Sequence, residues 1–157
     1  MDRDVLERLR SLLVTERLLA LAVSVDGEPE AGLLPYAVSG DCLALYVQAS
    51  GLARHARGLR PGGRVGVLIH EADSPTLDPM QIARLTVQAT VRVLDKSSAE
   101  FDAARALFVA RFPAADTTLA LDDFNLYALT LGRGRYVEGF ARAFNVGPDT
   151  FAEIAAL

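Results

Sequence analysis

The side chains best suited to chemistry are gathered in one basic segment of an acidic chain. Five cationic or imidazole side chains fall within eleven residues: Arg54, His55, Arg57, Arg60 and Arg64. Ser50 is predicted to cap a short helix over 52–60. The free N–H groups of a helix start and a pair of arginine forks both bind charged oxygen. The spacing therefore predicts an anion site, most naturally for a phosphate, although a basic helix face turned to solvent fits the same residues.

A second polar group is predicted on one face of a long strand over 82–94. Apolar and polar residues alternate there, and the polar face carries Arg84, Thr86 and Gln88. The inward positions would be Leu85, Val87, Ala89, Val91 and Val93. A ligand cleft requires such a polar face, and so does a strand that faces solvent, so both interpretations stay open. Pro35 lies inside another predicted strand and indicates an edge or bulge, where backbone groups are free to meet a ligand.

The other reactive side chains exclude several chemistries. Cys42 is the single cysteine, so the chain forms no internal disulfide, and its apolar neighbours predict a buried strand thiol. Two histidines, His55 and His70, are too few for a metal site of the usual His/Cys kind. His70 is predicted to be an ordinary surface histidine. Tyr36 and His55 are the only candidates for a general acid, and no catalytic residue is assigned.

Length and composition predict one domain over 1–157. Of the 157 residues, 51% are hydrophobic and 23% are charged, which is too apolar for a disordered chain. No apolar run approaches the roughly 20 residues of a membrane span, and the acidic start lacks the pattern of a signal peptide. The net charge of −4 argues against a nucleic-acid partner. We therefore expect a cytoplasmic protein with no membrane or nucleic-acid partner.

The elements that must position these residues follow from hydrophobic periodicity and turn residues. Helices are predicted over 5–13, over 52–60 with Leu52, Ala56 and Leu59 inward, from a capping box at Ser97–Glu100 to Phe112 with Leu107 and Phe108 inward, and after Pro148. Strands are predicted over 18–25, 30–38, 42–48, 64–69, 82–94, 125–132 and 136–140, the last two joined by Arg133-Gly134-Arg135. Short antiparallel strands with few helices between them predict a mainly β protein, a small barrel with flanking helices.

Five stretches of the sequence together resemble a known family. They read LALAVSVDGEPEAGLLPYAV, SGLARHARGLRPGGRVGVLI, IARLTVQATVRVL, DFNLYALTLGRGRYVEGFARAF and, less distinctively, ALFVARFPAA. Between Leu18 and Phe144 the chain resembles the pyridoxamine-phosphate-oxidase-like FMN-binding split barrels, in particular their haem-utilisation (HugZ-like) group. The resemblance implies a six-stranded antiparallel split barrel that forms a homodimer and holds FMN in each of two clefts between protomers.

The same resemblance implies a set of cofactor-binding residues. The strand over 33–36 would run beside the flavin ring and ribityl chain, and the Gln48–Ser50 segment would contact the flavin or its phosphate. The Arg54-His55 pair would bind the phosphate, and Arg84 and Thr86 would reach the cofactor from the partner subunit. With Arg57 added from the basic segment, the predicted cofactor-binding residues are Leu33, Leu34, Pro35, Tyr36, Gln48, Ser50, Arg54, His55, Arg57, Arg84 and Thr86.

Several positions depart from the family pattern. Asn is usual where Gly58 lies, and Gly-Gly-Phe is usual where this chain has Glu138-Gly139-Phe140. His55 replaces the lysine of true pyridoxamine-phosphate oxidases, and their substrate-binding Arg-x-His pair has no match. These differences argue against oxidation of that vitamin phosphate. No histidine follows His70 in the sequence, which argues against the C-terminal axial histidine of haem-degrading relatives.

The leading hypothesis is an FMN-dependent oxidoreductase that acts as a homodimer on an unidentified small molecule. The alternatives are a haem-binding or haem-utilisation protein without flavin turnover, a deazaflavin-dependent reductase, and a fold that serves only dimeric association. The hydrophobic content also predicts a homodimer with an apolar seam, because obligate interfaces resemble a core cut in half. A polar cleft at the edge of that seam would be lined by Ser50, Arg54, Arg84 and Thr86.

Overall fold

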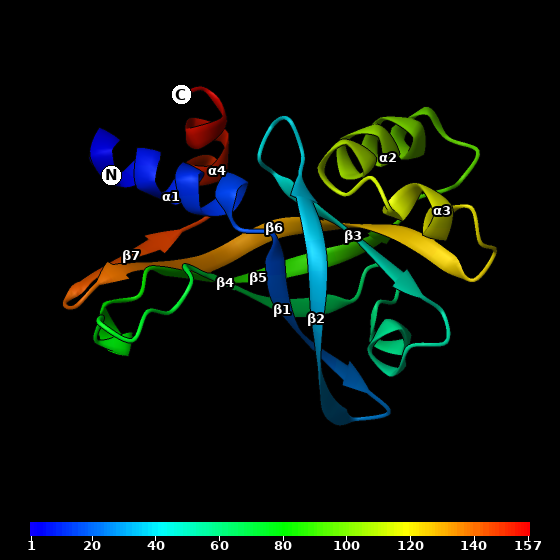
Figure 1. Cartoon of the computed structure of the whole chain (residues 1–157), viewed down its shortest axis with the longest axis horizontal. Helices are drawn as coiled ribbons and strands as arrows, with labels where there is room; N and C mark the ends of the chain where they lie inside the picture. Colours follow the sequence, from blue (N-terminus) through cyan, green and yellow to red (C-terminus); the bar gives the residue numbers. More distant parts are fainter.

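The computed structural model describes all residues, 1–157, and forms a β-barrel flanked by two groups of helices (Figure 1). The strands are β1 (Leu18–Val25), β2 (Glu28–Val38), β3 (Ala44–Ser50), β4 (Arg64–His70), β5 (Arg84–Val93), β6 (Phe124–Gly139) and β7 (Arg142–Val146). The helices are α1 (Arg3–Thr15), α2 (Ala99–Arg111), α3 (Ala115–Leu119) and α4 (Pro148–Ala155), with two 3₁₀ turns, η1 (Arg54–Gly58) and η2 (Pro79–Gln81). None of these helices combines the length and the apolar character that crossing a membrane would require.

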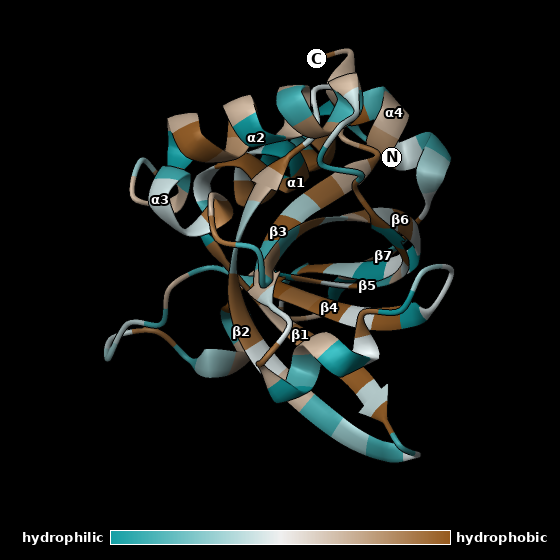
Figure 2. Cartoon of the chain, turned by 90° about the vertical axis from the view of Figure 1, so that its right-hand side faces the viewer, coloured by the Kyte–Doolittle hydropathy of each residue, from teal (hydrophilic) through white to brown (hydrophobic).

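The sheet closes on itself. Its strand order is β3-β2-β1-β4-β5-β6-β7, every neighbouring pair is antiparallel, and β3 also pairs with β6. The first six strands therefore form a closed six-stranded antiparallel barrel, as predicted, and β7 extends the sheet beyond it. Since β2 pairs with β3 only over Tyr36–Val38, residues 28–35 of β2 have a strand partner on the β1 side alone, which agrees with the edge position predicted from Pro35. Hydrophobic strand residues face the barrel interior, while the tip of the β1–β2 hairpin is hydrophilic (Figure 2).

The helices pack against the barrel in two groups. Helices α1 and α4 lie together at one end (Figure 1), and their buried residues Leu9, Leu13 and Phe151 belong to the main barrel core. Helices α2 and α3 cover β2, β3 and β6 through a smaller cluster that contains Phe101 and Phe108. Each amphipathic helix thus buries one apolar face, which is the main source of helix stability in a folded protein.

Arg111, the last residue of α2, links this helix to the end of α1. Its guanidinium donates hydrogen bonds to the carbonyl oxygens of Val14 (2.8 Å), Thr15 (3.2 Å) and Glu16. Helix α1 has no basic residue in its last turn, so the end of α2 supplies the cation that a helix C-terminus favours. The Tyr36 hydroxyl adds a hydrogen bond of 2.8 Å to the Leu13 carbonyl. The start of β1 is thereby fixed relative to α2.

Local hydrogen bonding moves several predicted boundaries. Cys42 is buried, as predicted, but its φ of 55° places it in the turn before β3 instead of in the strand. The cap of α2 is Ser98, one residue after the predicted position, and its hydroxyl accepts from Phe101 N–H. Leu107 and Val93, predicted to face inward, are 45% and 40% exposed.

The largest difference from the predicted elements is β6, which runs unbroken through Arg133-Gly134-Arg135. These residues were expected to join two strands, but they lie at a bulge in β6: the pairing passes from Val87–Gly134 to Ala89–Leu131, so two residues of β6 lie opposite one residue of β5. A Cβ atom on Gly134 would lie 2.4 Å from the Thr86 carbonyl oxygen. The glycine therefore permits a close strand approach, and the chain reverses only at the β6–β7 turn.

Candidate functional site

The predicted phosphate cradle at the basic segment does not form. Residues Arg54–Gly58 make a single 3₁₀ turn, and its N-cap is Ala53. Ser50 Oγ instead donates to Asp123 Oδ2 at 2.6 Å and accepts from Leu52 N–H. Leu52, predicted to face inward, is 87% exposed. The segment therefore offers neither the helix start nor the free hydroxyl on which the anion interpretation depended.

Two cations of this segment are already paired with carboxylates of the β1–β2 hairpin. Arg54 forms an ion pair with Glu30, and Arg57 bonds Asp26 at 2.8 Å. The His55 ring packs on the β2 backbone, because a Cβ on Gly32 would lie 3.0 Å from His55 Cγ. His55 Nε2 is buried without a hydrogen-bond partner. A phosphate would have to displace two carboxylates here, so this geometry argues against the predicted role of these residues.

A close approach to β1 explains why Gly58 stands where the family usually has asparagine. A Cβ there would lie 2.6 Å from Val23 Cβ and 3.2 Å from the Ser24 carbonyl oxygen. We expect Gly58→Asn to lower the free energy of unfolding by about 1–3 kcal/mol, the usual cost of overpacking. Gly40→Asn is the matched control, because nothing lies within 4 Å of a Cβ at Gly40. Urea unfolding of both variants measures the difference, and equal stability would contradict the close contact.

Two further predicted site residues, Tyr36 and Gln48, make hydrogen bonds within the protein. Tyr36 is fully buried, with its hydroxyl bonded to the Leu13 carbonyl, and burial raises the pKa of this phenol far above its usual value. A phenol enclosed in this way has no access to a substrate, which argues against Tyr36 as a general acid. Gln48 accepts a hydrogen bond of 3.0 Å from the Thr118 hydroxyl. Leu34 is also buried, which leaves Leu33 and Pro35 as the outward residues of that strand.

The outward residues of the sheet line up in a row. The strand register places Leu33 beside Ala20, Ala20 beside Leu68 and Leu68 beside Thr86. The row continues from Thr86 to Arg135 and on to Asn145. It therefore crosses from an apolar half on β2, β1 and β4 to a polar half on β5, β6 and β7. A pocket lies in each half of this outer face.

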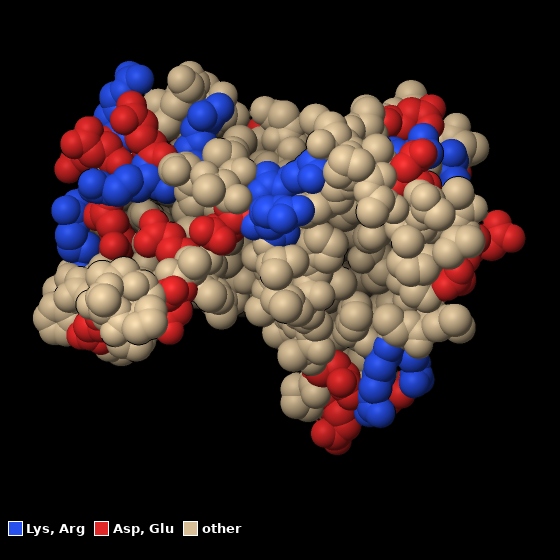
Figure 3. Space-filling view, in the orientation of Figure 1, with Lys and Arg blue, Asp and Glu red and all other residues tan.

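The apolar pocket has a volume of about 730 Å³. Its lining residues are Thr15, Glu16, Arg17, Leu18, Ala20, Leu33, Pro35, Leu68, His70, Ala72 and Phe112. Leu33 and Leu18 are 66% and 50% exposed, so they offer apolar area to a ligand. Figure 3 shows little charge over the middle of β1 and β2 except for a basic patch where α1 ends, whereas acidic and basic side chains gather at the tip of the β1–β2 hairpin. Arg17 lies in that region, with its guanidinium 5.2 Å from the centre of the Phe112 ring.

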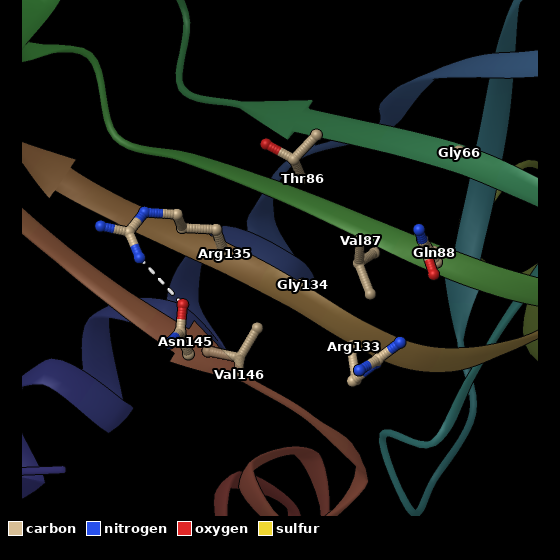
Figure 4. Close-up of a pocket in the computed structure, with 9 residues that line it drawn as sticks. All are labelled: Gly66, Thr86, Val87, Gln88, Arg133, Gly134, Arg135, Asn145 and Val146. Atoms are coloured by element: carbon tan, nitrogen blue, oxygen red, sulfur yellow. Dashed lines mark hydrogen bonds between the residues drawn. The ribbon is translucent and has the colours of Figure 1, made fainter.

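The polar pocket has a volume of about 620 Å³ and lies over β5, β6 and β7 (Figure 4). Its lining residues are Gly66, Thr86, Val87, Gln88, Arg133, Gly134, Arg135, Asn145 and Val146. Arg135 donates to the Asn145 side-chain oxygen at 2.8 Å, and neither Arg133 nor Arg135 forms an ion pair. This pocket is therefore suited to a small anion or a hydrogen-bonding group.

The structure brings together only part of the predicted site. Leu33 and Pro35 line the apolar pocket, Thr86 lines the polar pocket, and Arg84 is the strand partner of His70. The remaining predicted residues lie in the core, at α3 or around η1. The sequence analysis missed Leu18, Leu68, Arg17, Phe112 and His70. The outward positions of the strand alternation could have indicated Leu18, Leu68 and His70, whereas Phe112 and Arg17 meet only through tertiary packing.

Comparison with known proteins gives a consistent picture. No family model matches the chain. The haem oxygenase HutZ of Vibrio cholerae is 28% identical over 168 residues, covering all of this chain and 94% of that protein. The structure of a haem-binding protein from Mycobacterium smegmatis superposes with a TM-score of 0.84 at 26% identity, over 98% of this chain. The present chain spans 62% of the length of that protein.

A more distant comparison identifies the fold. A protein of the pyridoxinephosphate oxidase family from Clostridium acetobutylicum matches over 96% of this chain with a TM-score of 0.66 and 14% identity. Fold neighbours at similarly low identity include proteins described as FAD-binding. These matches show the split-barrel fold alone, which is compatible with several ligands.

Proposed function

The homologues of this chain are HutZ/HugZ-like haem-binding proteins and split barrels of the pyridoxine-phosphate oxidase family. From this similarity and from the pocket geometry, we propose that the chain binds haem in its apolar pocket. The observation that carries the proposal is the composition of that pocket, in which Leu18, Leu33, Leu68 and Phe112 stand beside one histidine and one free arginine. Its volume of about 730 Å³ lies within the range of small-molecule sites.

The pocket lining fits haem in two respects. The outward leucines cover a flat apolar ring, and burial of apolar area contributes about 25 cal/mol per Å². Arg17 lines the pocket and Arg84 lies beside His70 in the sheet register. Neither guanidinium forms an ion pair. Arg84 donates one hydrogen bond of 3.0 Å to the Ile82 carbonyl, and its remaining N–H groups, like those of Arg17, could bind propionate carboxylates. Bound haem would supply redox-active iron, while the chain would supply apolar walls, charge and orientation.

Flavin remains the second candidate, because the polar pocket could hold a phosphate between Arg133 and Arg135. The test is a pair of absorbance titrations of the purified protein, one with haemin and one with FMN, followed by a deazaflavin cofactor. We expect a saturable Soret change with one haem per chain and no flavin binding at the same concentrations. Saturable FMN or deazaflavin binding without haem binding would contradict the proposal and support the oxidoreductase alternatives. Binding of none of them would favour a fold that serves only association.

We also propose that two copies of the chain associate through the outer face of β1, β2 and β4. Small residues make this face flat, namely Ala20, Ala22, Ala31 and Gly66, and Leu33 stands exposed beside them. A second copy covers such a patch and removes an apolar surface that monomers avoid. The predicted homodimer would bring the two apolar pockets close to the seam between protomers.

Light scattering at micromolar concentration is expected to give twice the chain mass. Ala22→Arg places an unpaired charge on the flat face and is expected to give a monomer, because burying that charge costs several kcal/mol. Ala22→Ser keeps the size and is the control that should remain dimeric. A monomeric parent protein, or a dimeric Ala22→Arg variant, would contradict this interface.

A further inference from the structure

We propose that His70 is the protein ligand of the haem iron and binds it through Nε2. The inference rests on the proposed haem site. It gives a role to a histidine that the sequence predicts to be an ordinary surface residue. His70 lines the apolar pocket together with Leu33 and Leu68. Glu16 is the one other side chain in that lining able to ligate iron, and its hard carboxylate suits haem iron less well than imidazole does.

The hydrogen bond of His70 fixes which ring nitrogen is available. His70 Nδ1 lies 2.7 Å from the carbonyl oxygen of Glu71. A carbonyl oxygen only accepts hydrogen bonds, so Nδ1 must carry the proton and donate it. The lone pair is then on Nε2. Histidines that bind metals commonly hold their second nitrogen in this way, by donation to a backbone carbonyl, so His70 already has the tautomer that ligation needs.

The position of His70 in the sheet holds its ring on the pocket wall. It is the last residue of β4, outward of the fully buried Ile69, and it pairs with Arg84 on β5. The next residue is held as well, because Glu71 N–H donates to the Ala83 carbonyl at 3.0 Å. A ligand on a paired strand is positioned more accurately than one on a free loop.

The other potential iron ligands are either enclosed or, like the exposed Met1 and Met80 and the partly buried Tyr46, lie outside the pocket lining. His55 Nε2 is buried against β2, as described above. Cys42 is 5% exposed within the main core, and burial raises the pKa of its thiol, which disfavours the thiolate that would ligate iron. Tyr36 and Tyr136 are also buried. His70 is therefore the strong ligand that both reaches the outer face and adjoins a cavity of suitable size.

The experiment compares haem-loaded parent protein with His70→Ala and with His55→Ala, which removes the only other histidine. The readouts are the iron–histidine stretching band of the ferrous form, the Soret position and the haem dissociation constant. We expect the parent and His55→Ala to show the iron–histidine band and His70→Ala to lose it, with haem binding weakened about tenfold or more. Added imidazole should restore the ligated spectrum of His70→Ala.

Two other results separate the two proposals. If haem binds and His70→Ala keeps the iron–histidine band, or if His55→Ala alone loses it, the assignment of His70 is wrong while haem binding stands. If the parent protein binds no haem, the proposed function fails and the ligand assignment fails with it. Circular dichroism of His70→Ala checks that the variant is folded, which its exposed position at the strand end favours.

Discussion

Replacing Leu68 with aspartate is expected to weaken haemin binding by at least about 100-fold, or about 2.7 kcal/mol. Leu68 lines the apolar pocket and stands between Ala20 and Thr86 in the outer row. A carboxylate there would be covered by the porphyrin without a partner, which costs several kcal/mol. It would also repel the propionates of haem. The measurement is the Soret titration, with folding checked by circular dichroism.

Two controls isolate the effect of Leu68→Asp on the pocket. Leu77→Asp adds the same charge at a loop residue that is 52% exposed and outside the pocket lining, and it should bind haemin like the parent protein. Ala22→Arg, the monomer variant, reports the part of the loss that comes from dissociation alone. If Leu68→Asp binds haemin within threefold of Leu77→Asp, haem does not occupy the apolar pocket.

Replacing Arg111 with alanine is expected to lower the free energy of unfolding by about 2–4 kcal/mol. The change removes the charged donor from the exposed carbonyls of Val14 and Thr15 and from the partly buried carbonyl of Glu16. A hydrogen bond to a charged group contributes about 1.5–3 kcal/mol, and less where water can replace it. It also removes the guanidinium that lies 5.5 Å from the Tyr36 ring centre. Denaturant unfolding of the two proteins gives the difference.

The matched control is Arg105→Ala, on the same helix. Arg105 forms an exposed ion pair with Asp116, and exposed pairs contribute about 0–1 kcal/mol. A loss below about 1 kcal/mol in Arg111→Ala, equal to that of the control, would show that α1 does not depend on this contact. Since Thr15, Glu16 and Arg17 line the apolar pocket, we further expect Arg111→Ala to weaken haemin binding.

The barrel was predictable because its signals are local. The alternation on β5 gives its buried face directly, from Leu85 to Val91. The Asp26-Gly27 turn has positive φ at both residues, as a tight hairpin requires. Family resemblance then supplied closure of the six strands, which no single stretch encodes.

The site was less predictable because its contacts are distant in sequence. The sequence predicts Ser50 to be a helix cap, but its hydroxyl donates a hydrogen bond to Asp123, which is 73 residues away in the sequence. Arg54 reads as a phosphate ligand, but Glu30 on β2 pairs with it. The polar neighbours of Gly134 predict a turn, whereas this glycine lies in a continuous strand beside a bulge in β6, where it allows a close approach to β5. In each case a contact with a residue distant in sequence decides between two structures that the local sequence allows.

The proposed haem site predicts the position of the iron, and the iron can be located directly. A crystal of the protein grown with haemin and measured at the iron absorption edge should show one anomalous peak per chain in the apolar pocket, between Leu33, Leu68 and His70. A peak at the polar pocket beside Arg133 and Arg135, or at the His55 segment, would contradict the account.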